Sequence, residues 1–278
     1  MNNTKSILSS IVKTSGIYLN KVLGVFKTER HLSAPSQRRT DNDPPFYNLF
    51  PSALEREIVN CRIDISPSYK FVYFRIPKAA NSTIVASLYH AETSIELTSQ
   101  VEINKIKADH FLFPDQLNLE QVNEMMENYF KFTFTRNPYR RIISAYLDKI
   151  IRNKGGKRDS IAGFLLKPNG SDISFDEFLK YLEMGGINQN GHWARQIDLL
   201  PIPLDKFDFI GKIENLSVEL PGVLYKLFNR DCKIITMREH ATNAEDAYLN
   251  LNQELYDRIY KIYEADFEYF KYPRIFNV

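Results

Sequence analysis

The chain has 278 residues, of which 44% are hydrophobic and 25% are charged, and its formal net charge is +2. This length and apolar content suffice for a large α/β domain with a filled core. A charge so close to neutral argues against a global basic field, and therefore against a nucleic acid as the main partner. The two cysteines, Cys61 and Cys232, lack metal-ligand spacing and fit a reducing compartment.

We predict an N-terminal helix and polar arm over residues 1–57, followed by the folded domain over residues 58–278. Apolar residues recur at helical spacing between Ile7 and Phe26, but Lys13 and Lys21 interrupt them. A membrane span needs about 20 mostly apolar residues, and the segment does not resemble a cleavable signal. We therefore expect a cytoplasmic protein in which this segment is a surface helix, a loosely held arm or a peripheral membrane contact.

Two apolar runs, each followed by a helical pattern, are predicted as buried parallel strands. Phe71–Phe74 precedes a helix over Thr83–His90, and Phe130–Thr135 precedes a helix that starts at Tyr139. This second helix is expected to end near Asn153, since two glycines follow.

The second half of the chain continues the alternation. A capping box, Ser174 with Glu177, predicts a helix, Asp208–Gly211 predicts a short strand, and Val218–Phe228 and Leu251–Glu268 show helical spacing. Alternating strands and helices predict an α/β fold with a parallel, doubly wound sheet. Its ligand is expected at the carboxyl ends of the strands.

The turns that follow the two predicted strands have the features of one phosphate-binding device. At a strand-to-helix turn, free N–H groups and the helix dipole face an anion. In the second turn, Arg136 and Ser144 lie about two helical turns apart and can clamp a second phosphate. The alternative is structural: a solvated lysine, a helix-capping serine and an arginine in a surface ion pair. The first turn supplies Lys78, Ala79, Ala80, Asn81, Ser82 and Thr83.

These motifs resemble those of a known family, the carbohydrate sulfotransferases that use 3'-phosphoadenosine 5'-phosphosulfate (PAPS), with Golgi-type and bacterial members. Pro77-Lys78-x-x-x-Ser82-Thr83 is similar to their 5'-phosphosulfate loop, and Arg136-x-Pro138-x-x-Arg141-x-x-Ser144 to their 3'-phosphate motif. Ala80 stands where many members have glycine, and Asn137 replaces a frequent aspartate. Further similar blocks are His192–Gln196, Phe207–Leu216 and Ile262–Phe267.

The resemblance implies a P-loop NTPase-like three-layer sandwich with a central parallel sheet, PAPS as sulfate donor and no metal. Lys78 would stabilise charge on the leaving group and, with residues 79–83, Arg136 and Ser144, would bind the donor. His110, between the two motifs, is expected to be the catalytic base, with His192 as its main rival. Asp109 and Glu102 are weaker alternatives. His192, Trp193 and Arg195 are expected to contact the acceptor, although His192 and Trp193 could equally be a core pair.

The predicted function is therefore transfer of a sulfuryl group from PAPS to a hydroxyl group, most naturally that of a carbohydrate acceptor. One alternative is a non-catalytic nucleotide- or glycan-binding protein on the same scaffold. A nucleotide-dependent kinase is a weaker alternative, because the Walker A order G-x-x-x-x-G-K-[ST] is absent. The sequence does not identify the acceptor or the oligomeric state.

Overall fold

The computed structural model of the chain describes residues 43–153, 155–237 and 251–274. These residues belong to the unit that spans Thr40–Val278. The helix predicted between Ile7 and Phe26 lies outside the described residues. In the part of the chain that is described, we find no helix that combines the length and the apolar character needed to cross a bilayer.

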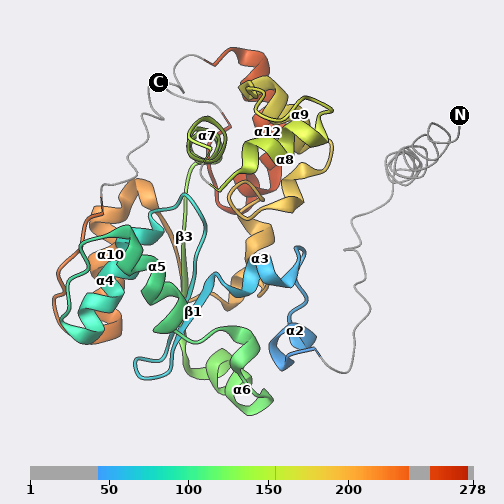
Figure 1. Ribbon diagram of the computed structural model, residues 1–278. Helices are drawn as coiled ribbons and strands as arrows, with labels where there is room; N and C mark the ends of the chain where they lie inside the picture. Colours follow the sequence, from blue (N-terminus) through green and yellow to red (C-terminus); the bar gives the residue numbers. More distant parts are fainter. Residues whose placement is uncertain (1–42, 154, 238–250, 275–278) are drawn as a thin grey trace, which may run out of the picture. The chain divides into compact units, whose positions relative to one another are not determined.

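A four-stranded sheet with the order β1–β2–β3–β4 lies at the centre of the described unit (Figure 1). β2 (Phe71–Phe74), β3 (Phe130–Thr135) and β4 (Phe209–Lys212) are parallel. β1 (Ile63–Ser66) is antiparallel to β2 at the edge of the sheet. Because β2 and β3 are adjacent and parallel, the turns that follow them lie at the same edge.

The sheet separates two layers of helices, which makes the fold a three-layer sandwich. Successive side chains of a strand point to opposite faces. Phe71 and Tyr73 accordingly join one core cluster, and Val72 and Phe74 join the other. The first cluster includes residues of α4 (Asn81–Thr93), α5 (Gln100–Asp109) and α10 (Leu216–Phe228), and the second includes residues of α7 (Pro138–Tyr146), α9 (Phe175–Glu183) and α12 (Gln253–Tyr269). The predicted α/β class, with its mostly parallel central sheet, is confirmed.

Further elements complete the second layer. They are α2 (Pro45–Leu49), α3 (Arg56–Asn60), α6 (Leu119–Asn128), α8 (Lys157–Phe164) and a π-helical turn over Leu147–Ile151. Phe46 of α2 is fully buried in the same cluster as α7 and α12. Residues that the sequence assigns to a polar arm therefore already contribute to the core, because Phe46 and its neighbour Tyr47 are aromatic.

The turn from β3 into α7 is fixed by local chemistry. Asn137 caps the helix, with its side chain accepting hydrogen bonds from the N–H groups of Tyr139 at 3.0 Å and Arg140 at 3.4 Å. Pro138 occupies the first helical position, where its missing N–H costs nothing. Arg136 is consequently held at the point where the strand ends and the helix begins.

Most of the predicted elements agree with the structure. β2 and β3 have the predicted bounds, and α9 begins at the predicted capping box. The helix after β3 continues past α7 as a π turn. The sequence patterns did not predict β1, α2, α3, α5, α6 or α8, although Ser99 with Glu102 and Asn118 with Gln121 form capping boxes that begin α5 and α6.

Candidate active site

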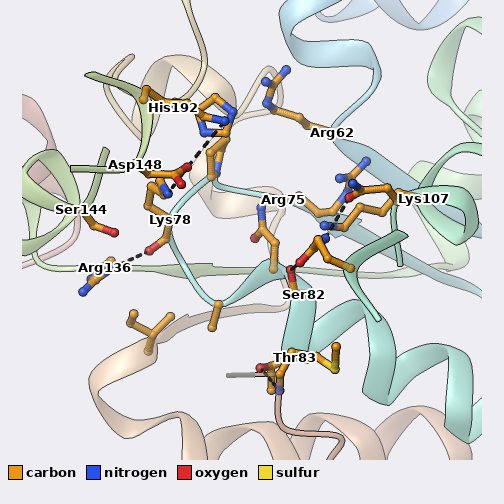
Figure 2. A pocket seen from close by; sticks show the side chains of 18 of the residues that line it. Arg62, Arg75, Lys78, Ser82, Thr83, Lys107, Arg136, Ser144, Asp148 and His192 are labelled. Atoms are coloured by element: carbon orange, nitrogen blue, oxygen red, sulfur yellow. Dashed lines mark hydrogen bonds and ion pairs between the residues drawn. The ribbon is translucent and has the colours of Figure 1, made fainter. Parts of the chain in front are cut away.

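A cavity of about 790 Å³ lies where the turns after β2 and β3 meet (Figure 2). Its described lining residues come from both turns, α5, the π turn and the segment around His192. Figure 2 shows Arg136 and Ser144 at one side and Arg62 and Lys107 at the other. We call Lys78, Arg136 and Ser144 the loop end, and Arg62, Arg75 and Lys107 the basic end.

The turn after β2 presents backbone groups to the cavity. Lys78 and Ala80 have φ values of +70° and +54°, the left-handed conformation that glycine adopts most easily. An alanine there costs about 1 kcal/mol, which explains why glycine would suit this position. Within the described residues, no side chain caps the first turn of α4, so its N–H groups can meet an anion. The cavity is lined by Ala80, Asn81, Ser82 and Thr83, whereas Ala79 is buried beneath the turn.

Lys78 is paired with a carboxylate that the sequence analysis missed. The Lys78 Nζ lies 2.7 Å from Oδ2 of Asp148, and Lys149 Nζ lies 3.5 Å from the same oxygen. Burial lowers the pKa of Lys78 although Asp148 opposes this effect. Asp148 follows Ser144 by four residues, about one helical turn, and this spacing indicates that both side chains lie on the same face of the helix.

The structure brings the two predicted phosphate motifs into direct contact. Nη1 of Arg136 donates a hydrogen bond of 3.0 Å to the carbonyl oxygen of Lys78, and both residues line the cavity with Ser144. The nearby Arg141 is fully buried and donates to the carbonyl oxygens of Pro77 and Ala194 at 3.0 and 2.7 Å. Arg141 thus joins the first turn to the segment that carries His192.

The three residues expected to contact an acceptor have different surroundings. His192 lines the cavity, and burial, followed by the charges of Lys149 and Arg62, lowers its pKa well below the usual value. Its Nδ1 is buried and has no hydrogen-bond partner among the described residues. Trp193 is a core residue whose Nε1 donates to the carbonyl oxygen of Gly186. Arg195 donates to the carbonyl oxygen of Ile262 and does not line the cavity.

His110 lies outside the cavity lining. It caps the C-terminus of α5, and its Nε2 lies 2.6 Å from Oε2 of Glu92. Its ring also meets the rings of Tyr89 and Phe111 edge to face. Asp109 and Glu102, the weaker candidates for the catalytic base, are likewise not among the described lining residues.

The basic end is assembled from three separate segments. Arg62 precedes β1, Arg75 follows β2 and Lys107 belongs to α5. Nε of Arg75 donates to Oδ1 of the buried Asp64 at 2.9 Å, and burial is the main cause that raises the pKa of Asp64. Burial, followed by the charges of Arg75 and Arg62, lowers the pKa of Lys107 to about 8. No sequence motif links these segments, so the sequence alone does not predict that their basic side chains meet.

The cavity is basic and lies at the carboxyl ends of parallel strands, where two neighbouring strands each lead into a helix. This arrangement is typical of α/β proteins that bind phosphate-bearing ligands. Comparison with protein families then gives a match over residues 61–273 to the sulfotransferase family. The match covers well over half of the chain, and the chain therefore belongs to this family. The family resemblance stated from the motifs is confirmed.

Two of the relatives are vertebrate proteins. Carbohydrate sulfotransferase 14 of Mus musculus is 30% identical over 187 residues, which are 61% of this chain and 47% of the mouse protein. Carbohydrate sulfotransferase 11 of Danio rerio is 24% identical over 273 residues, which are 89% of this chain and 74% of that protein. The chain thus spans about half the length of carbohydrate sulfotransferase 14. No solved structure matches with statistical significance.

The expectation of a cytoplasmic protein is wrong. It rests on the cysteine content and on the interrupted N-terminal pattern, neither of which is specific to a compartment. The relatives found by comparison include carbohydrate sulfotransferases 10, 11 and 14 of vertebrates, and their names do not support a cytoplasmic location for this chain.

Proposed function

We propose that this protein transfers the sulfuryl group of PAPS to a hydroxyl group of a carbohydrate. The observation that carries the proposal is the loop end, where Lys78 and Arg136 line one cavity and are joined by a hydrogen bond of 3.0 Å. A donor with phosphates at both the 3' and 5' positions needs two anion sites close together. Membership of the sulfotransferase family and similarity to proteins named carbohydrate sulfotransferases support the same reaction.

The composition of the cavity fits such a donor. Among its described lining residues, six are lysine or arginine and one, Asp148, is a carboxylate. The volume of about 790 Å³ lies within the range of about 300–1,000 Å³ that is usual for small-molecule sites. Arg136 and Ser144 would hold the 3'-phosphate, and Lys78 with the N–H groups of residues 80–83 would hold the 5' end.

Lys78 is the residue placed to stabilise the leaving group. Negative charge grows on the 5'-phosphate as the sulfuryl group departs, and a buried ammonium stabilises it more strongly than water would. To contact the donor, Lys78 must exchange its ion pair with Asp148 for the phosphate. Asp148 would therefore keep the ammonium charged and oriented before the donor arrives, despite the burial that lowers its pKa.

We assign the base to His192 rather than His110, since His192 lines the cavity and His110 does not. With its lowered pKa, the His192 imidazole is neutral at pH 7 and can accept a proton. The S–O bond to the 5'-phosphate breaks, an S–O bond to the acceptor oxygen forms, and the hydroxyl proton moves to His192. The products are a sulfated carbohydrate and adenosine 3',5'-bisphosphate.

The basic end favours an acceptor that carries negative charge. Arg62, Arg75 and Lys107 all line the cavity, and Figure 2 shows Arg62 and Lys107 at the side opposite Arg136 and Ser144. Burial, followed by the charges of Arg75 and Arg62, lowers the pKa of Lys107, and a carboxylate or sulfate group bound between these cations would offset their mutual repulsion. Carbohydrates with uronic acid or sulfate groups meet this requirement.

The test is transfer of label from radiosulfate-labelled PAPS to a panel of neutral and acidic glycans. Calorimetry with adenosine 3',5'-bisphosphate and with AMP, on the wild type and Arg136→Ala, tests the donor site. We expect label on an acidic glycan, and a loss of bisphosphate affinity of about 10- to 100-fold in the variant with little change for AMP. Equal weakening of both nucleotides would contradict the site, and binding without transfer would favour the non-catalytic alternative.

A further inference from the structure

The backbone N–H and C=O groups of Arg136 are both held by a buried glutamine. The backbone N–H of Arg136 donates to Oε1 of Gln196 at 2.9 Å, and Nε2 of Gln196 donates to the carbonyl oxygen of Arg136 at 2.9 Å. Gln196 is fully buried. A primary amide has both a donor and an acceptor, so it can satisfy both backbone groups of a single residue, which neither a carboxylate nor an apolar side chain can do.

Gln196 is in turn fixed by a carboxylate of α12. The backbone N–H of Gln196 donates to Oδ2 of Asp266 at 2.8 Å, and that of Ile197 donates to Oδ1 at 3.0 Å. Asp266 is fully buried. Both of its oxygens are thus committed to the segment that carries Gln196, which orients the amide that holds Arg136.

A second contact restrains the following residue. The backbone N–H of Asn137 donates to Oε1 of Glu214 at 2.8 Å, and the hydroxyl of Tyr272 donates to Oε2 of Glu214 at 3.1 Å. β3 has its last paired residue at Thr135, opposite Lys212. Side chains therefore take over the hydrogen bonds that the sheet no longer provides at residues 136 and 137, and they set the direction in which Arg136 leaves the strand.

We propose that Gln196, held by Asp266, is a positioning residue that aims Arg136 at the 3'-phosphate of the donor. This inference rests on the proposed function, because it takes the 3'-phosphate as the ligand of Arg136. Gln196 does not line the cavity and acts through the backbone of Arg136. A bidentate guanidinium contact depends strongly on direction, so a small rotation of the Arg136 backbone weakens it.

The test compares Gln196→Met with the wild type. Methionine has nearly the same size and removes both hydrogen bonds without adding charge. Calorimetry gives the ratio of the dissociation constants of AMP and adenosine 3',5'-bisphosphate, and we expect this ratio to fall about tenfold, with the AMP value nearly unchanged. In the transfer assay, KM for PAPS should rise while kcat changes little, because a contact made in both ground and transition states is weakened.

Thr133→Val is the matched control. The Thr133 hydroxyl makes a buried hydrogen bond of 2.7 Å to the carbonyl oxygen of Phe74, also on the central sheet, and it does not contact Arg136. This variant should lose stability but keep the nucleotide ratio. Asp266→Asn serves as a second variant if Gln196→Met does not fold, and it should lower the ratio in the same direction.

The possible outcomes distinguish the proposed function from the positioning role of Gln196. A wild-type protein without preference for the bisphosphate would overturn the proposed function and this inference together. A wild-type preference that Gln196→Met and Asp266→Asn both retain would overturn the positioning role alone. A fall in the ratio for Thr133→Val as large as that for Gln196→Met would also overturn it, because general destabilisation would then explain the effect.

Discussion

The two ends of the cavity carry their positive charge in different ways. At the loop end, Lys78 is paired with Asp148 and the Arg136 guanidinium donates to a backbone carbonyl. At the basic end, Arg75 is paired with Asp64, whereas Lys107 lies close enough to Arg75 and Arg62 for their charges to lower its pKa. From this difference we expect the loop end to bind a ligand of fixed geometry, and the basic end to accept anionic ligands of more variable shape.

Replacement of Lys78 by methionine should give the largest effect, because it removes the charge that we propose stabilises the leaving group. We expect kcat to fall by about 10²–10³-fold, as for loss of a group that stabilises developing charge. Lys149→Met is the matched control: it removes another lysine that contacts Asp148, and it should cost less than tenfold. Steady-state transfer rates measure both, and equal losses in the two variants would remove the special role of Lys78.

The next effect concerns the base between the two ends. His192→Asn should lower turnover by about 10²-fold, as for loss of a general base, while nucleotide affinity is nearly kept. His110→Asn should retain activity, since its ring pairs with Glu92 outside the cavity lining. Single-turnover transfer and calorimetry separate chemistry from binding. A larger loss of turnover in His110→Asn than in His192→Asn would instead identify His110 as the base.

The smallest effect should come from the basic end and depends on pH. Lys107 is cationic below its pKa of about 8 and neutral above it, so affinity for a sulfated oligosaccharide should fall as pH rises through 8. Loss of one partly exposed charge contact is worth up to about 1 kcal/mol, or about fivefold. Sulfate groups remain ionised throughout this range, and His192 is already neutral.

Lys107→Arg isolates this titration, because arginine keeps its charge well above pH 9. Its affinity for the same oligosaccharide should stay level between pH 7 and 9. Fluorescence titration of a labelled oligosaccharide measures both curves. Parallel curves for the wild type and Lys107→Arg would show that Lys107 does not contribute to acceptor binding.

The contrast between the ends also explains what the sequence could predict. Lys78, Arg136 and Ser144 lie in two contiguous motifs, each attached to a strand whose apolar pattern is clear, so both the elements and their meeting point could be expected. Arg62, Arg75 and Lys107 become neighbours only through the pairing of β1 with β2 and the packing of α5. The spacing of these three residues along the chain does not predict that they are neighbours.

Histidine illustrates the same limit. The position of His110 between the two motifs favoured it, but order along the chain does not determine which face of a helix a residue occupies. At the C-terminus of α5 its ring meets Tyr89 and Phe111, away from the lining. His192 reaches the cavity because Arg141 binds the carbonyl oxygens of Gly191 and Ala194 on either side of it.

Asp148 lies in the π turn over Leu147–Ile151. The direction of its side chain therefore depends on the number of residues in this turn as well as on the residue type. A π turn accommodates about one more residue than an α turn, and one residue corresponds to about 100° of rotation around a helix axis. Deleting a single amino acid here would restore a regular α-helical turn and change the direction of the side chains within it, including Asp148. The ion pair between Asp148 and Lys78 is therefore more sensitive to a one-residue insertion or deletion in this turn than to a conservative substitution.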